Sequence, residues 1–289
     1  MSGVLSAFLA SPTVHTALVV GTVVAVLSGI VGVFTITRGQ SFAGHALADL
    51  GAVGGSGAFL LGVSQLWGFV AAGVLSAVVM EAIGTRRLAG RDVATGVVFG
   101  AGTGLTALFL TLDTLIGGSS NAAISVLFGS LFSIDSRLVP VIVGLGVVAV
   151  AVVALIWRWV SLETLDSDLA AARGVPTRWA SSLFLVALAL AVQLSSLSIG
   201  AILSTALLIG PPATALLFTR RLGTAAVLAA TLAVAQVFVG CLVSFASFDW
   251  FGGSSWPVSF TIVAAVFLTY LSARAVTALR PAPRRGAVA

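Results

Sequence analysis

Two side chains in the second long apolar stretch, His45 and Asp49, are the residues best suited to chemistry. They lie four positions apart, so on a helix both project from one face, about 6 Å apart along the axis. Imidazole nitrogen and carboxylate oxygen are ligands that manganese, iron and zinc all accept. Because ionisable groups within a membrane span are costly and usually functional, the pair indicates metal binding or proton handling. The structural alternative is a buried, hydrogen-bonded pair with neither role.

The composition places this pair in a polytopic, all-α membrane protein. Hydrophobic residues make up 59% of the 289 residues and charged residues only 8%, against about 25% charged in soluble domains. The apolar stretches are continuous, which argues against a β-barrel. The chain contains no lysine, so it lacks the residue with which a P-loop holds nucleotide phosphates. Whatever the protein does, it does not hydrolyse ATP with a P-loop of its own.

The arginines define the expected topology. Thirteen of the fourteen fall on one side of the candidate spans, and only Arg137 falls on the other. Arginine-rich loops mark the cytoplasmic side, so we expect the N-terminus outside and the C-terminus inside. The net charge of +5 thus reflects topology and gives no reason to expect nucleic acid as a partner. The nine candidate spans are 14–36, 41–63, 66–85, 93–113, 139–160, 179–196, 199–218, 223–246 and 257–277.

Two segments fall outside this simple count. Residues 114–138 are half polar and half apolar, and they are expected to form a re-entrant or interfacial helix packed against protein. Depending on them, the number of spans is eight, nine or ten. Residues 161–178 form the longest cytoplasmic segment, where Ser167 is expected to cap a short helix that ends at Gly174. Such a helix is suited to docking a soluble partner, and a plain surface loop is the alternative.

The seventh span contains two consecutive prolines. Pro211 and Pro212 follow Gly210 within an apolar run, and proline removes backbone hydrogen bonds from a helix. We therefore expect the helix to break here and to free backbone carbonyls. In transporters such breaks often line the substrate path, whereas in other membrane proteins they are only kinks. Nearer the cytoplasmic side, Glu81 is expected to reach toward Arg86 or Arg87.

Four segments of the chain resemble, in the right order, the permeases of ABC-type zinc, manganese and iron importers. Residues 198–217, SIGAILSTALLIGPPATALL, look like the signature span of that family. Residues 41–62 resemble its metal-site span, and residues 127–139 its LFG segment. Asp166, Ala170 and Gly174 match the D-x3-A-x3-G pattern of its cytoplasmic coupling segment. The resemblance extends over about residues 14–277.

One departure from the family pattern affects the metal site. In the family an Asp comes first and a His follows four residues later, whereas here His45 precedes Asp49. The order is inverted but the two ligand types are kept. The resemblance therefore implies that His45 and Asp49 contact the metal in transit, and the inversion leaves the identity of the metal open.

The resemblance implies a single permease domain over residues 1–289, like a type II ABC importer, in a bacterial cytoplasmic membrane. It also implies a homodimer that works with two ATPase subunits and an extracellular or periplasmic metal-binding protein. The metal ion would be the transported substrate, with no tightly bound cofactor and no enzymatic activity in this chain. The residues expected to couple to the ATPase are Asp166, Asp168, Ala170 and Gly174.

Three alternatives remain open on the sequence alone. A proton-coupled secondary transporter would use Asp49 as its proton carrier, and an ABC permease for a metal chelate or vitamin would share the architecture. A membrane anchor or assembly subunit would leave Asp49 unexplained. Zinc, manganese and iron are not separated by one His and one Asp, because all three accept nitrogen and oxygen ligands.

Overall fold

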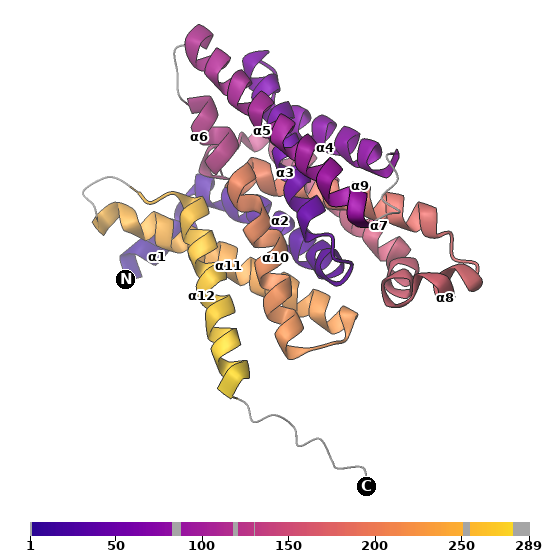
Figure 1. Cartoon of the computed structure of the whole chain (residues 1–289). Coiled ribbons are helices and arrows are strands. Elements are labelled where there is room, and N and C mark those ends of the chain that lie inside the picture. Colours follow the sequence, from indigo (N-terminus) through magenta and orange to yellow (C-terminus); the bar gives the residue numbers. More distant parts are fainter. Residues whose placement is uncertain (1, 83–87, 118–120, 130, 251–254, 280–289) are drawn as a thin grey trace.

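The computed structural model describes residues 2–82, 88–117, 121–129, 131–250 and 255–279, and in these ranges all regular structure is helical (Figure 1). The helices and 3₁₀ turns are α1 (Ser2–Ala10), α2 (Pro12–Thr37), α3 (Ser41–Leu60), α4 (Gln65–Ala82), α5 (Leu88–Gly117), α6 (Asn121–Phe128), η1 (Leu131–Ser133), η2 (Ser136–Leu138), α7 (Val139–Leu165), α8 (Ser167–Ala172), α9 (Thr177–Ile199), α10 (Ala201–Phe218), α11 (Leu222–Trp250) and α12 (Val258–Leu279).

The lengths and composition of these helices are those of a multi-pass membrane protein. Among the described residues, seven are long and apolar enough to cross a membrane, namely α2, α5, α7, α9, α10, α11 and α12. The apolar part of α4 is shorter, and α3 carries five glycines together with His45 and Asp49. Each of the nine expected spans coincides with one of these nine helices, but the number that cross the bilayer and their orientation stay predictions. Helix α1 was not predicted from the sequence, and its Phe8 is buried against Phe238 and Phe245 of α11.

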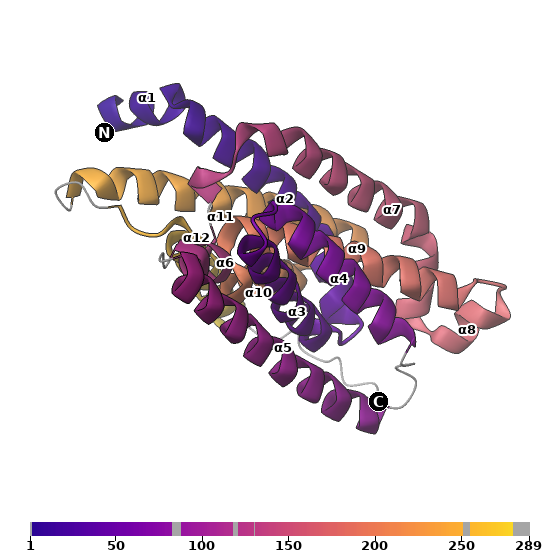
Figure 2. The same ribbon diagram turned by 90° about the horizontal axis from the view of Figure 1, so that it is seen from above.

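Helices α2 and α9 form the centre of the bundle. Helix α2 packs against α7, α9, α10 and α11, and α9 packs against α2, α3, α4, α7 and α10. Their facing side chains, which include Leu27, Phe34, Phe184 and Leu188, are fully buried. Seen from above, α8 lies at one extremity of the molecule, beyond the ends of α7 and α9 (Figure 2). The central helix α9 therefore runs from α8 into the middle of the protein.

At the end of the bundle opposite α8, two glycines join segments that are distant in sequence. Gly129 follows α6 with φ +79° and Gly200 separates α9 from α10 with φ +92°, conformations that only glycine adopts readily. A side chain on either one would collide with the backbone of the other segment. Helix α6 also packs against α3, α9 and α10. The expected short helix within 114–138 is thus present and packed on protein, as a re-entrant segment must be.

Helices α3 and α4 approach each other through glycine. Gly54 of α3 lies against the carbonyl of Gly68 in α4, and Gly68 lies against the carbonyl of Gly54. Burial alone does not drive helices together in lipid, so small residues that allow close backbone contact set the packing. The two helices are thereby fixed to each other as an antiparallel pair.

A methyl group at this contact should separate the two helices. We expect Gly54→Ala to lower the free energy of unfolding by about 1–3 kcal/mol, the usual cost of overpacking, and therefore to lower the midpoint of thermal unfolding in detergent. Gly144→Ala is the matched control, because Gly144 of α7 has open space around its Cα and alanine there favours the helix by up to about 1 kcal/mol. Equal unfolding midpoints for the two variants would contradict the close contact.

Candidate functional site

His45 and Asp49 lie on one face of α3, in its first two and a half turns. Their side chains approach to 3.8 Å between Nε2 and Oδ2, which is longer than a hydrogen bond. The Asp49 side chain is 13% exposed and that of His45 is 40% exposed. The buried Oδ2 of Asp49 has no hydrogen-bond partner among the described residues. The structure therefore does not form the hydrogen-bonded pair considered as the structural alternative, and Oδ2 of Asp49 is left without a donor among the described residues.

One chain supplies only part of a metal site at this position. Phe99 of α5 covers the imidazole of His45, with ring centroids 5.4 Å apart. In the part of the chain that the structure describes, no three His, Cys, Asp or Glu side chains cluster closely enough to hold a metal ion. The two side chains on α3 thus offer one nitrogen ligand and one carboxylate, fewer ligands than a complete metal site needs.

A buried glutamine that the sequence analysis missed holds α3 between these two residues. Gln193 of α9 is fully buried, and its Nε2 donates to the carbonyl of Leu47 at 2.8 Å. Its side chain fills the space left by Gly51 of α3 and Gly73 of α4. The sequence feature that indicates a role for Gln193 is an amide within an apolar span. A polar side chain in lipid needs a hydrogen-bond partner. Gln193 therefore sets the position of the helix that carries His45 and Asp49.

The expected coupling segment contains a short exposed helix, α8. Asp166, not Ser167 as expected, is its N-cap: Oδ1 of Asp166 accepts from the backbone N–H groups of Asp168 at 2.9 Å and Leu169 at 3.0 Å. Serine and aspartate are equally good caps, and the aspartate lies one residue earlier in the chain. The helix ends before Gly174, which has φ +76°, and Val175 N–H donates to the carbonyl of Ala170.

The faces of this segment differ sharply in exposure. Ala170 is buried against the bundle, whereas Leu165 is 78% exposed and Leu169 is 46% exposed. Asp168 and Gly174 are exposed as well. A short helix with a buried alanine and an outward leucine, next to the exposed Leu165 at the end of α7, is suited to docking against another protein, because exposed apolar side chains mark interaction sites.

The expected break at Pro211 and Pro212 is wrong. Helix α10 continues through both prolines from Ala201 to Phe218. Proline leaves the carbonyl four residues earlier without a partner, and for Pro212 this is the carbonyl of Leu208. That carbonyl lies against Gly32 of α2, which also contacts the ring of Pro212. A neighbouring helix therefore covers the altered backbone, as membrane helices allow, while Gly210 lies against Val266 of α12. A role for the three residues in the translocation path stays a prediction.

Comparisons with known proteins agree with this architecture. The sequence model of the ABC 3 transport family matches residues 10–274. The manganese import system permease protein ScaB of Streptococcus gordonii is 27% identical over 241 residues, which cover 83% of this chain and 85% of that protein. The manganese transport system membrane protein MntC of Halalkalibacterium halodurans is 29% identical over 228 residues, covering 79% and 77%.

A solved structure has the same fold. The structure of PsaBC from Streptococcus pneumoniae in complex with Fab superposes with a TM-score of 0.80 at 24% sequence identity, covering 94% of each chain. The all-helical permease fold expected from the sequence is therefore confirmed. The metal, the coupling residues and the helix orientation stay outside this likeness, which concerns the backbone alone.

The cap of α8 can be tested directly. Asp166→Ala removes the acceptor for two backbone N–H groups, a loss that costs about 0.5–2 kcal/mol at a helix N-terminus. Amide hydrogen exchange at Asp168 and Leu169 should accelerate by about 2- to 30-fold, the same free energy expressed as local opening. Asp166→Asn is the matched control because asparagine caps about as well. Unchanged exchange in the alanine variant would show that Asp166 does not cap α8.

Proposed function

This chain belongs to the ABC 3 transport family, and on that premise we propose that it is the membrane permease of an importer for divalent manganese. Family membership and the apolar helices make it a multi-pass protein of the cytoplasmic membrane. Manganese is supported by relatives whose names specify manganese import. A site of one imidazole and one carboxylate is compatible with manganese, as it is with zinc and iron.

The observation that carries this proposal is the unpartnered Oδ2 of Asp49 beside His45. A carboxylate in a membrane protein interior is costly unless it is paired, and a passing divalent cation supplies the missing charge. The metal is thus the substrate and not a resident cofactor. Two ligands from one chain bind weakly, which suits transport because an ion that binds too tightly is not released.

A second copy of the chain completes the site in this proposal. Two Asp49 carboxylates balance the charge of one divalent cation, and two neutral imidazoles of His45 add nitrogen ligands. The 40% exposure of His45 in a single chain leaves its ring accessible to such a partner. The working permease is then a homodimer with the metal between its α3 helices.

Two further partners supply energy and selectivity. Two ATPase subunits dock on the α8 helices, through the exposed Leu165 and Leu169 and the polar groups of Asp168 and Gly174. This places α8 in the cytoplasm, as the arginine distribution predicts. A metal-binding protein outside the cell delivers the ion, so that high affinity resides there and not in the membrane.

Metal uptake tests the proposal. Cells that express the chain with its ATPase and binding protein should accumulate manganese, and His45→Ala or Asp49→Ala should lower the rate by about tenfold or more. Even outer-shell partners of metal ligands are worth about 10- to 100-fold. His15→Ala is the matched control, because the other histidine lies at the far end of α2, where its Nε2 is 2.6 Å from the carbonyl oxygen of Leu9.

The controls separate the alternatives. Zinc and iron measured in parallel identify the metal, and an ATPase-dead partner should abolish uptake. Uptake that persists without ATP hydrolysis would indicate a secondary transporter. ATP-dependent uptake that is unchanged in both variants would exclude His45 and Asp49 as the transit site.

A further inference from the structure

An arginine at the end of α2 joins three helices near α8. Arg38 is the C-cap residue of α2, and its Nη1 donates to Oε2 of Glu163 in α7 at 3.1 Å. Its Nη2 donates to Oγ of Ser181 in α9 at 3.0 Å. The side chains of Arg38 and Glu163 are only 9% and 13% exposed. Charged hydrogen bonds shielded from water are short and directional, so this contact fixes the three helix ends relative to one another.

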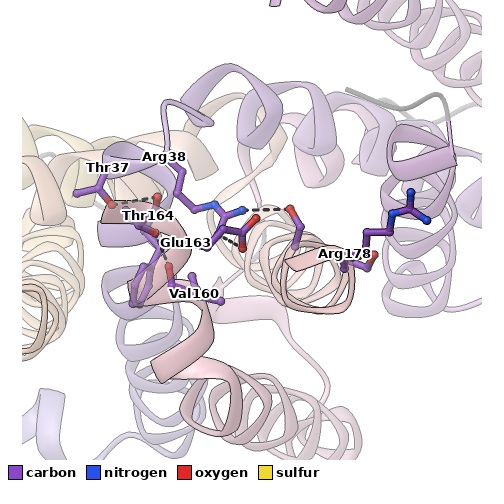
Figure 3. Close-up of polar contacts among 9 residues, drawn as sticks. Thr37, Arg38, Val160, Glu163, Thr164 and Arg178 are labelled. Atoms are coloured by element: carbon purple, nitrogen blue, oxygen red, sulfur yellow. Dashed lines mark hydrogen bonds and ion pairs between the residues drawn. The ribbon is translucent and has the colours of Figure 1, made fainter. Parts of the chain in front are cut away.

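Aromatic rings keep the guanidinium in place. The Arg38 guanidinium carbon lies 5.2 Å from the centroid of the Phe184 ring, a cation–π distance. Phe34 packs edge-on against both Phe184 and Trp157. Figure 3 shows Arg38 directed at Glu163, whereas the guanidinium of Arg178 points away from the cluster. The contact is therefore a built feature of this end of the bundle and not a chance pairing of surface charges.

Ser182, the residue after Ser181 in α9, connects these three helices to a fourth helix, α4. The hydroxyl of Ser182 is shared between Oε1 of Glu81, near the end of α4, at 3.0 Å and the carbonyl of Arg178 in its own helix at 2.8 Å. The sequence suggested Arg86 or Arg87 as partners of Glu81, but both lie outside the described residues. We call Arg38, Glu163, Ser181, Ser182 and Glu81 the α8-end network. It connects α9 to α2 through one serine and to α4 through the other.

The network lies between α8 and the helix of the metal site. Glu163 comes three residues before the N-cap of α8, and Ser181 lies in the second turn of α9, just after α8. On the other side, Arg38 is three residues from the start of α3, with only Gly39 and Gln40 between them. A displacement of α8 therefore acts on both partners of Arg38, Glu163 and Ser181. Through Arg38 it also acts on the connection of Gly39 and Gln40 that leads into α3.

Helix α4 gives a second connection to the same helix. Glu81 ties α4 to Ser182, and the Gly54–Gly68 contact ties α4 to α3. Thus α3 is held at its start by Arg38, which precedes it by three residues, and along its length by α4. By contrast, α2 and α3 pack on each other very little, so direct contact between them is a poor route for transmitting motion.

We propose that Arg38 and the α8-end network couple movement of α8 to the helix carrying His45 and Asp49, so that ATP hydrolysis drives metal release. This inference rests on the proposed function as an ABC permease. It assigns to Arg38, Glu163, Ser181, Ser182 and Glu81 a positioning role, because none of them is one of the proposed metal ligands, His45 and Asp49. Their loss should therefore change the amount of metal moved per ATP hydrolysed more than it changes folding or metal binding.

The test measures manganese uptake and ATP hydrolysis in one preparation. For this, the permease is reconstituted in proteoliposomes with its ATPase and binding protein. Ser181→Ala/Ser182→Ala removes both serine contacts at little cost to the helix. Arg38→Met/Glu163→Leu removes the ion pair without leaving an unpaired buried charge, a replacement that folded proteins often accept. Arg158→Met is the matched control, because Arg158 is an exposed arginine on α7, outside the network and outside residues 161–178.

We expect both double variants to assemble and to hydrolyse ATP, with uptake per ATP lower by about fivefold or more, the lower range of measured coupling between sites. Arg158→Met should match the wild type. An unchanged ratio of uptake to hydrolysis in either double variant would overturn the coupling role. A wild-type protein that shows no ATP-dependent uptake would instead overturn the proposed function, so the two failures are distinguishable.

Discussion

The close packing of α3 against its neighbours is the constraint on which the candidate site depends. Glycine replaces larger side chains where α3 meets α4, at Gly54 and Gly68, and where it meets Gln193 of α9, at Gly51. Because lipid gives no hydrophobic drive for helix association, close contact and buried hydrogen bonds must supply it. Helix α3 therefore stays packed against α4 and α9 although it carries His45 and Asp49 into an apolar interior. The polar pair is tolerable because the helix behind it is rigidly held.

Helix α9 connects the two ends of the molecule through this arrangement. At one end its Ser181 and Ser182 meet α2 and α4, and in its middle Gln193 meets α3. At the other end Gly200 packs against Gly129. Because most of its residues from Phe184 to Ile199 are buried, α9 has little room to bend independently of its neighbours. A movement that begins beside it at α8 is therefore transmitted along the bundle instead of being absorbed locally.

The sequence predicted those features that depend on local pattern. Long apolar runs gave the helices, the spacing of His45 and Asp49 placed them on one face, and Asp166, Ala170 and Gly174 marked the α8 segment. It failed where a distant partner decides the outcome. Pro211 and Pro212 do not break α10, because Gly32 of another helix covers the freed backbone. Gln193 and Arg38 acquire their partners from residues far away in the chain, so the amide in an apolar span indicates that Gln193 has a partner but not which one.

We propose that a manganese ion passes between His45 and Asp49 of two chains, and the ligands of a bound ion can be measured. Electron paramagnetic resonance of manganese(II), with the purified permease in nanodiscs, reports both the number of ions per chain and the nitrogen atoms coupled to them. We expect one ion per two chains, with histidine nitrogen coupling that disappears in His45→Ala. One ion per chain, or nitrogen coupling that persists in that variant, would refute a shared site.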